Sequence, residues 1–148
     1  MYKKILVPLD GSQRAEKILP HVIDMAGRYA AELVLLKVDE PEMLLGVDEV
    51  VDFENRLAER RRHKVETEAY LDGVAQSLKE QGLKVRTLIA FGLPVKAILD
   101  TAQSEDAGLV AMASHGFGGQ LRQFYGSTVA GVLQRIDRPL LLVRSRQG

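Results

Sequence analysis

Cysteine is absent from this sequence, and histidine occurs only three times, as His21, His63 and His115. The absence of cysteine excludes disulfides, a thiolate nucleophile and cysteine-ligated zinc. Three scattered histidines also make a poor set of metal ligands. Any chemistry of this protein must therefore use oxygen, nitrogen and backbone groups.

Long hydrophobic runs are missing as well. The first apolar stretch, residues 5–7, is too short for a secretory signal or a membrane span. No later apolar run approaches the ~18 residues that a membrane-spanning helix needs. We therefore expect a cytoplasmic protein that does not enter a membrane.

Charge of one sign is not in excess, because 20 lysines and arginines balance 20 aspartates and glutamates. A nucleic-acid-binding protein normally carries a positive field that attracts phosphate groups, so nucleic acid is not an expected partner. Residues 60–64, Arg-Arg-Arg-His-Lys, form the densest basic run, but Glu54, Glu59, Glu66 and Glu68 surround them. This mixture indicates a solvated helix face.

The composition that is present is that of an ordinary globular protein, with 46% hydrophobic and 27% charged residues. A chain of 148 residues can bury roughly two-thirds of its unfolded surface without disulfides or a structural metal. The sequence shows no internal repeat, low-complexity tract or linker. We predict a single domain over residues 1–148.

Five short apolar runs predict β-strands. The runs are continuous rather than alternating, which is typical of parallel strands that are covered by helices on both faces. The predicted strands are residues 5–7, 33–38, 84–90, 107–113 and 140–143.

Between these strands, apolar residues recur with the i, i+3, i+4 spacing of helices. Pro20 interrupts the first helical pattern and can bend it, and Gly82 is placed to end the second. Residues 39–53 show no clear period and are predicted to form a long loop, of a kind that is often functional. The predicted helices cover residues 15–26, about 54–81, 94–102 and 127–135.

Alternating strands and helices specify an α/β fold with a five-stranded parallel sheet, doubly wound, because each right-handed crossover lays its helix on the sheet. Ligands of such sheets bind outside the carboxyl ends of the strands, where neighbouring connections run to opposite faces. Two unusual segments follow strands here. Residues 8–12, Pro-Leu-Asp-Gly-Ser, follow the first, and residues 113–128, rich in glycine, follow the fourth.

Gly126, Ser127 and Thr128 at the start of the fourth helix would direct backbone N–H groups and the positive end of the helix dipole at an anion. This is the outline of a phosphate site. Glycine-rich turns and Ser or Thr caps are equally common without a ligand, however, so a purely structural role stays open. Ser127 is expected to cap the helix in either case, and Asp10 on local grounds is readily a turn or capping residue.

Established phosphate motifs do not match this chain. Residues 116–120, Gly-Phe-Gly-Gly-Gln, satisfy neither the Rossmann fingerprint nor the P-loop. A receiver domain would need clustered acids after the first strand, where Asp10 stands alone, and a lysine after the fifth, where Arg144 stands. His115 has no partner for a catalytic triad and is expected to line a ligand or to form a hydrogen bond.

These residues resemble the universal stress protein family over essentially the whole chain. Nucleotide-binding members of that family carry G-x2-G-x9-G-[S/T] after the fourth strand, and this chain has Ala113-x2-Gly116-x9-Gly126-Ser127. Residues 5–12, Ile-Leu-Val-Pro-Leu-Asp-Gly-Ser, are similar to the family's first strand and its aspartate. Ala113 departs from the motif. Alanine would cost on the order of 1 kcal/mol if this position needed φ above zero, but little at the end of an extended strand, which we favour.

The resemblance implies a Rossmann-like fold of the adenine nucleotide alpha hydrolase-like type, with strand order 3-2-1-4-5. It also implies a site for ATP, or for ADP or AMP, with Mg²⁺ held by the phosphates, and a homodimer formed through the last strand. The implied nucleotide contacts are Pro8, Leu9, Asp10 and Val38 on the adenine and ribose side, Met112, Ala113, His115 and Gly116 along the ribose and phosphate path, Gly119 in the loop, and Gly126, Ser127 and Thr128 at the phosphates.

The leading hypothesis is a nucleotide-dependent regulator of a stress response or signal, with unidentified protein partners. Hydrolysis of ATP is expected to be slow at most, because no general base, arginine finger or Mg²⁺-binding carboxylate pair is evident. The alternative is a dimeric interaction module of the same fold that binds no nucleotide, which Ala113 favours. An enzyme of the wider adenine-nucleotide group ranks last, because its S-G-G-x-D-S and H-x-G-H signatures are missing.

Overall fold

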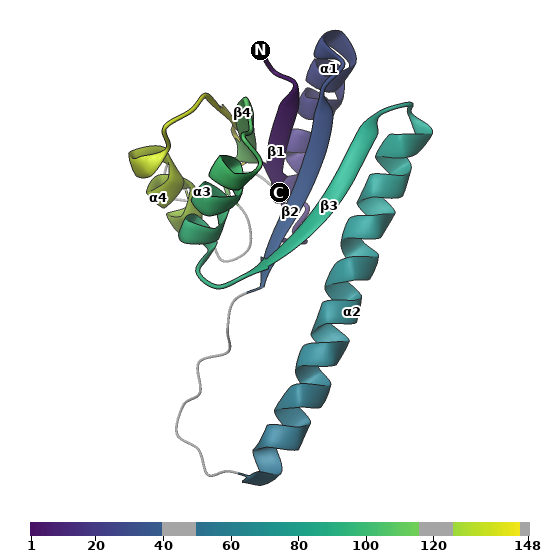
Figure 1. Cartoon of the computed structure of the whole chain (residues 1–148), viewed down its shortest axis with the longest axis vertical. Helices are drawn as coiled ribbons and strands as arrows, with labels where there is room; N and C mark the ends of the chain where they lie inside the picture. The colour runs from purple at the N-terminus through teal and green to yellow at the C-terminus, as the bar shows by residue number, and fades with distance from the viewer. Residues whose placement is uncertain (40–49, 116–125, 146–148) are drawn as a thin grey trace.

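Strands and helices alternate along the computed structural model, which describes residues 1–39, 50–115 and 126–145. Within these residues, one short 3-10 helix, η1, occupies the start of the first predicted helix. In chain order the elements are β1 (Lys4–Pro8), η1 (Ala15–Ile18), α1 (Leu19–Tyr29), β2 (Glu32–Asp39), α2 (Val50–Glu80), β3 (Lys84–Phe91), α3 (Pro94–Ser104), β4 (Leu109–Ala113), α4 (Ser127–Arg135) and β5 (Leu140–Val143) (Figure 1).

The five strands form one parallel sheet in the order β3-β2-β1-β4-β5. The predicted strand order and the predicted doubly wound α/β fold are therefore confirmed. β1 lies at the centre, with β2 on one side and β4 on the other. The crossover from β3 to β4 passes from one edge of the sheet back across its centre.

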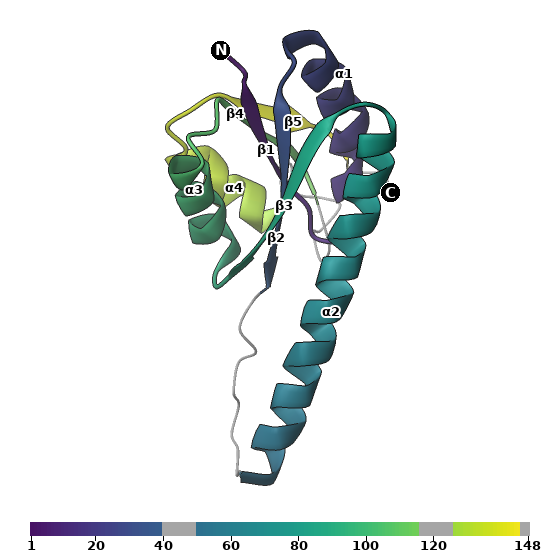
Figure 2. The same ribbon diagram turned by 45° about the vertical axis from the view of Figure 1, so that its right-hand side comes forward.

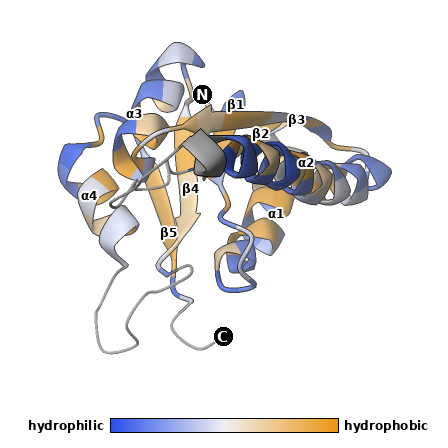
Figure 3. Cartoon of the chain, turned by 90° about the horizontal axis from the view of Figure 1, so that it is seen from below, coloured by the Kyte–Doolittle hydropathy of each residue, from blue (hydrophilic) through white to orange (hydrophobic). Residues whose placement is uncertain are grey.

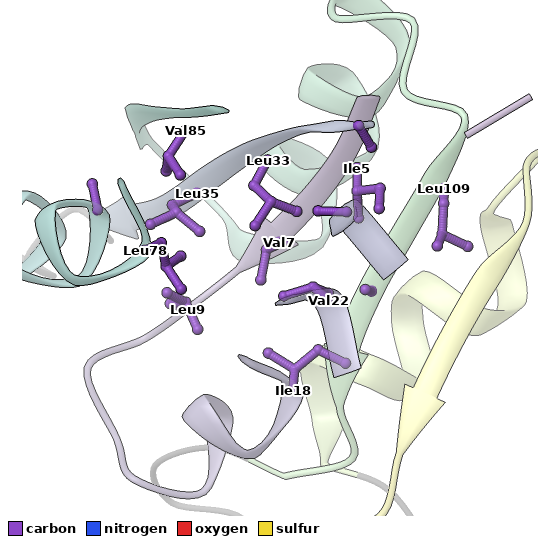
Figure 4. Packing of buried hydrophobic residues seen from close by; sticks show 14 of the residues in the cluster. Ile5, Val7, Leu9, Ile18, Val22, Leu33, Leu35, Leu78, Val85 and Leu109 are labelled. Carbon is purple, nitrogen blue, oxygen red and sulfur yellow. The ribbon is translucent and has the colours of Figure 1, made fainter. Parts of the chain in front are cut away.

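Successive residues of each strand pack into two separate cores, because side chains alternate between the faces of a strand. Ile5 and Val7 of β1 pack with η1, α1 and α2 (Figure 4), whereas Leu6 packs with α3 and α4. Two helices thus cover each face of the sheet (Figure 2). The buried helix residues include Ile18, Val22 and Leu78 in the first core and Ile98, Val129 and Val132 in the second.

The first predicted helix is divided into η1 and α1. Pro20 lies in the first turn of α1. A proline is tolerated there because the backbone N–H that it lacks would have no carbonyl partner within the helix. The expectation that Pro20 bends a continuous helix is therefore wrong: it lies at the start of one. The strand predicted from residue 107 begins instead at Leu109.

α2 begins at Val50, so the prediction that residues 50–53 belong to a loop is wrong. The rest of that predicted loop, residues 40–49, lies outside the described residues. The first half of α2 extends past the carboxyl ends of the strands (Figure 1), and residues 60–64 are exposed there, as predicted for a solvated face. Gly82, with φ of +86°, follows the end of α2, as predicted. Within the described residues, no helix is both long and apolar enough to span a membrane.

An ion-pair network joins three strands to α3 at the amino ends of the strands. Arg86 of β3 donates from Nε to Glu32 of β2 at 3.0 Å and from Nη2 to Glu105, the residue that caps α3. Lys4 of β1 lies 3.4 Å from the same Glu105 oxygen. The hydrogen bond from Arg86 is the main reason that the pKa of Glu105 is lowered from its ordinary value.

This lowered pKa makes a pH-dependent contribution to stability. A carboxyl whose pKa is lower in the folded state stabilises the fold at neutral pH, and this contribution disappears as the pH falls through that pKa. We expect Glu105→Gln to lower the free energy of unfolding at pH 7 and to have a smaller effect at pH ~3, which lies below the ordinary glutamate pKa of ~4.3, because less of the contribution is left there. Denaturant unfolding of the wild type and of Glu105→Gln at both pH values measures this difference. Glu68→Gln, a substitution at an exposed residue, is the control. An effect of Glu105→Gln that is equal at both pH values would contradict this account.

Candidate functional site

The two halves of the sheet meet between β1 and β4, where the connections run to opposite faces. β1 leads into η1 and α1 on one face, and β4 leads towards α4 on the other, as Figure 3 shows from the end of the molecule towards which the strands run. Backbone pairing of β1 with β4 covers only Ile5–Leu109 and Leu6–Val110. The junction between these two carboxyl ends is where a doubly wound sheet forms its ligand crevice.

The β1 side of this crevice is a turn that Asp10 organises. Asp10 Oδ1 accepts hydrogen bonds from the backbone N–H of Ser12 at 2.9 Å and from its hydroxyl at 2.6 Å. Gly11 between them has φ of +91°, a conformation that favours glycine. The Ser12 hydroxyl in turn accepts from the N–H of Ala15, the first residue of η1, at 3.1 Å. Asp10 therefore has the turn role that the local sequence predicts, and its carboxylate is held just beyond the carboxyl end of β1.

The β4 side begins with Ala113, the residue that departs from the glycine motif. Ala113 is buried, pairs with Val143 of β5, and is not among the described residues with positive φ. Alanine therefore causes no backbone strain at this position, as expected for the end of an extended strand. Ser114 and His115, which follow it, are completely buried.

α4 begins on this side of the crevice. Gly126 caps it in an extended conformation, and its N–H donates to the carbonyl of Ser114 at 2.8 Å. A Cβ at position 126 would lie 3.4 Å from that carbonyl oxygen. The prediction that Ser127 caps the helix is wrong, because Gly126 is the capping residue and Ser127 is the first helical residue. Within the part of the chain that the structure describes, no side chain caps the amino end of α4. Backbone N–H groups in the first turn of a helix have no partner within that helix and can bind solvent or a ligand.

The remaining predicted contacts are distributed around the same end of the sheet. Val38 and Met112 belong to the core on the α3 and α4 face, and Leu9 is buried in the opposite core. Pro8 is half-buried at the end of β1, and Thr128 is half-buried in α4. Gly116 and Gly119 lie outside the described residues.

Sequence reasoning missed a buried polar cluster at the end of β2. Asp39 is 5% exposed, and its Oδ1 lies 3.1 Å from Lys37 Nζ and 3.2 Å from His63 Nε2. Thr67 also donates to this oxygen, at 3.3 Å. His63, predicted to be a surface or packing residue, therefore connects α2 to the end of β2. The sequence signal was an acidic residue directly after a buried strand.

A hydrogen bond also joins α2 to η1. The hydroxyl of Tyr70 donates to Glu16 Oε2 at 2.9 Å. Burial, followed by the hydrogen bond to Glu16, raises the pKa of Tyr70 above its ordinary value, so this phenol stays protonated at neutral pH. Among the described residues, no group of three histidine or acidic side chains forms a metal site.

Comparison with known proteins gives consistent results. A family model described as the universal stress protein family matches residues 1–144. Universal stress protein MJ0577 of Methanocaldococcus jannaschii is 32% identical over 159 aligned positions, which cover 99% of this chain and 97% of that protein. A solved structure of MJ0577 has a TM-score of 0.81 at 30% identity, covering 97% of this chain and 96% of that one.

Two further solved structures share the fold at lower identity. A universal stress protein in complex with cAMP has a TM-score of 0.71 at 19% identity, over 97% of this chain and 98% of that one. The universal stress protein from Archaeoglobus fulgidus in complex with dAMP has a TM-score of 0.65 at 18% identity, over 96% of this chain and 98% of that one.

Proposed function

Because this chain belongs to the universal stress protein family, we propose that it is a regulatory protein that binds an adenine nucleotide. The nucleotide that we propose first is ATP, and its site lies between the carboxyl ends of β1 and β4. The amino end of α4 is the observation that supports this proposal most strongly. It follows Gly126 on the β4 side of this junction and has no side-chain cap among the described residues. Backbone N–H groups in that position form a ready site for phosphate.

The proposal assigns the phosphates to Gly126, Ser127 and Thr128. A Cβ at position 126 would make only an ordinary contact with the Ser114 carbonyl oxygen, at 3.4 Å, so a larger side chain there should hinder an approaching phosphate more than it disturbs the fold. We also propose nucleotide contacts for Gly116, which is a glycine of the sequence motif, and for Gly119, which lies between Gly116 and Gly126 in the sequence.

The adenine and ribose are assigned to the ends of β1 and β2. Val38 offers an apolar contact on the face that Met112 shares, and Asp10 offers a carboxylate held by the Ser12 turn. The side chain of Leu9 is buried in the other core, so Leu9 would contact a nucleotide only through its backbone. Adenine nucleotides bound to two proteins of this fold, cAMP and dAMP, support this class of ligand.

We propose that any hydrolysis of bound ATP is slow. The carboxylate at the crevice, Asp10, already accepts two hydrogen bonds from Ser12 and is therefore a weak general base. Mg²⁺ would be held chiefly by the phosphates themselves and by water, as is usual for this ion. Nucleotide binding, rather than turnover, would then carry the cytoplasmic regulatory signal to protein partners.

Calorimetric titration of nucleotide-stripped protein with ATP and Mg²⁺ tests the proposal. We expect micromolar binding by the wild type and a loss of at least about tenfold in affinity in Gly126→Val, equivalent to ~1.4 kcal/mol. Asp10→Ala should also weaken binding. Gly73→Val is the matched control, because a Cβ at position 73 meets nothing within 4 Å. Failure of folded wild type to bind ATP, ADP or AMP would leave the partner-binding module as the better account.

We also propose a homodimer formed through β5. This strand lies at one edge of the sheet, and all four of its side chains, Leu140 to Val143, are only half-buried. An edge strand of this kind has unpaired backbone groups that a second copy can pair with.

Sedimentation at micromolar concentration tests the dimer. Wild type should sediment as a dimer and Leu141→Lys as a folded monomer, because a charge on the edge strand opposes pairing. Leu133→Lys, at an exposed leucine of α4, is the control and should remain dimeric. A monomeric wild type, or a dimeric and folded Leu141→Lys, would rule out this interface.

A further inference from the structure

Beyond the last residue pair of β4 and β5, the two chains remain joined through serine side chains. The regular ladder ends at Ala113 and Val143, and the N–H of Ser114 still donates to the carbonyl of Val143 at 2.7 Å. The N–H of Ser145 then donates to the hydroxyl of Ser114 at 2.9 Å. Side-chain oxygens here take the places that backbone carbonyls have within the sheet.

The hydroxyl of Ser145 binds both backbone groups of His115. It accepts from the His115 N–H at 3.0 Å and donates to the His115 carbonyl oxygen at 3.2 Å. The Ser145 hydroxyl therefore forms hydrogen bonds with both the N–H and the carbonyl of a residue thirty positions earlier in the sequence, as a residue of a neighbouring strand would. His115 follows β4 and directly precedes Gly116 of the glycine motif.

Ser145 and the residues that it contacts are buried away from solvent. Ser145 and His115 are each 1% exposed, and Ser114 is 0% exposed. Water cannot replace a hydrogen-bond partner at such positions, so removal of the Ser145 hydroxyl would leave a buried donor and a buried acceptor of His115 without their partner. The same region reaches α4, because the Ser114 carbonyl accepts from the N–H of Gly126.

We propose that Ser145 is a positioning residue of the nucleotide site. Its hydroxyl fixes the His115 backbone, and with it the neighbouring Ser114 carbonyl that accepts from Gly126 at the amino end of α4, without touching the nucleotide. The inference rests on the proposed nucleotide function and adds a residue that the family motif does not contain. It also links the site to β5, because Ser145 follows that edge strand by two residues.

The first test is titration of Ser145→Ala with ATP. We expect its dissociation constant to rise by about tenfold, a typical size for coupling between a binding site and a residue outside it. Val22→Ala is the matched control, because it removes buried atoms of α1 in the core on the opposite face of the sheet. It should bind ATP like the wild type. Equal affinity in Ser145→Ala and wild type, or an equal loss in both variants, would overturn the positioning role.

The second test uses wild-type protein and does not depend on whether Ser145→Ala folds. Coupling is reciprocal, so a contact that favours nucleotide binding must itself be stabilised by the nucleotide. ATP should therefore slow hydrogen exchange at the Ser145 amide more than at the Ala31 amide, which donates to Ala26 in a different part of the fold. Equal slowing at both amides would mean only a general stabilisation and would overturn the proposal.

The two proposals fail in different ways. A wild type that binds no adenine nucleotide removes both the nucleotide function and the positioning role. A wild type that binds ATP, with unchanged affinity in Ser145→Ala and no selective protection of the Ser145 amide, removes the positioning role alone.

Discussion

Both faces of the central sheet must be buried, and the rest of the molecule depends on this constraint. Leu33 to Leu36 of β2 are all buried, so no strand face in that region can be left to water. Two helices cover each face, and the chain supplies the second pair with α3, which lies in the crossover from β3 to β4, and with α4, which follows β4. That crossing makes β1 and β4 neighbours with connections on opposite faces. The crevice is therefore a consequence of covering the sheet.

The sequence predicted those features that have a periodic signal. Strand order followed from the family resemblance, and the bounds of α4 and β5 from apolar spacing bracketed by Gly126 and Pro139. The start of α2 was not predictable in this way, because its first half extends past the sheet and carries no apolar stripe. Pro20 was misjudged because periodicity alone does not show where within an apolar stripe a helix begins.

Polar residues of the site were harder to predict than the fold. Asp39 and Ser145 each follow an apolar strand, but their partners, His63 and His115, are distant in sequence and become neighbours only when the sheet forms. A buried serine or aspartate gives no period that would reveal its partner. Asp10 and Gly126 were found because turn chemistry and a spaced motif make them visible locally.

The carboxyl ends of β1, β2 and β4 each lead into a polar cluster that lies above the apolar cores. Ser12 is buried under the Asp10 turn, Asp39 under α2, and Ser114 beside β5. Buried polar groups of this kind are stable only when their hydrogen bonds are satisfied, so each cluster fixes the backbone around it. These clusters lie at the ends of β1, β2 and β4, the strands to which the proposed ligand contacts belong.

A crystal structure of the protein grown with ATP and Mg²⁺ tests this account most directly. The account predicts electron density for the nucleotide between the ends of β1 and β4, with phosphates on the backbone N–H groups of Ser127 and Thr128 and the base beside Val38. Nucleotide density at another surface, or an empty crevice at saturating ATP, would contradict it.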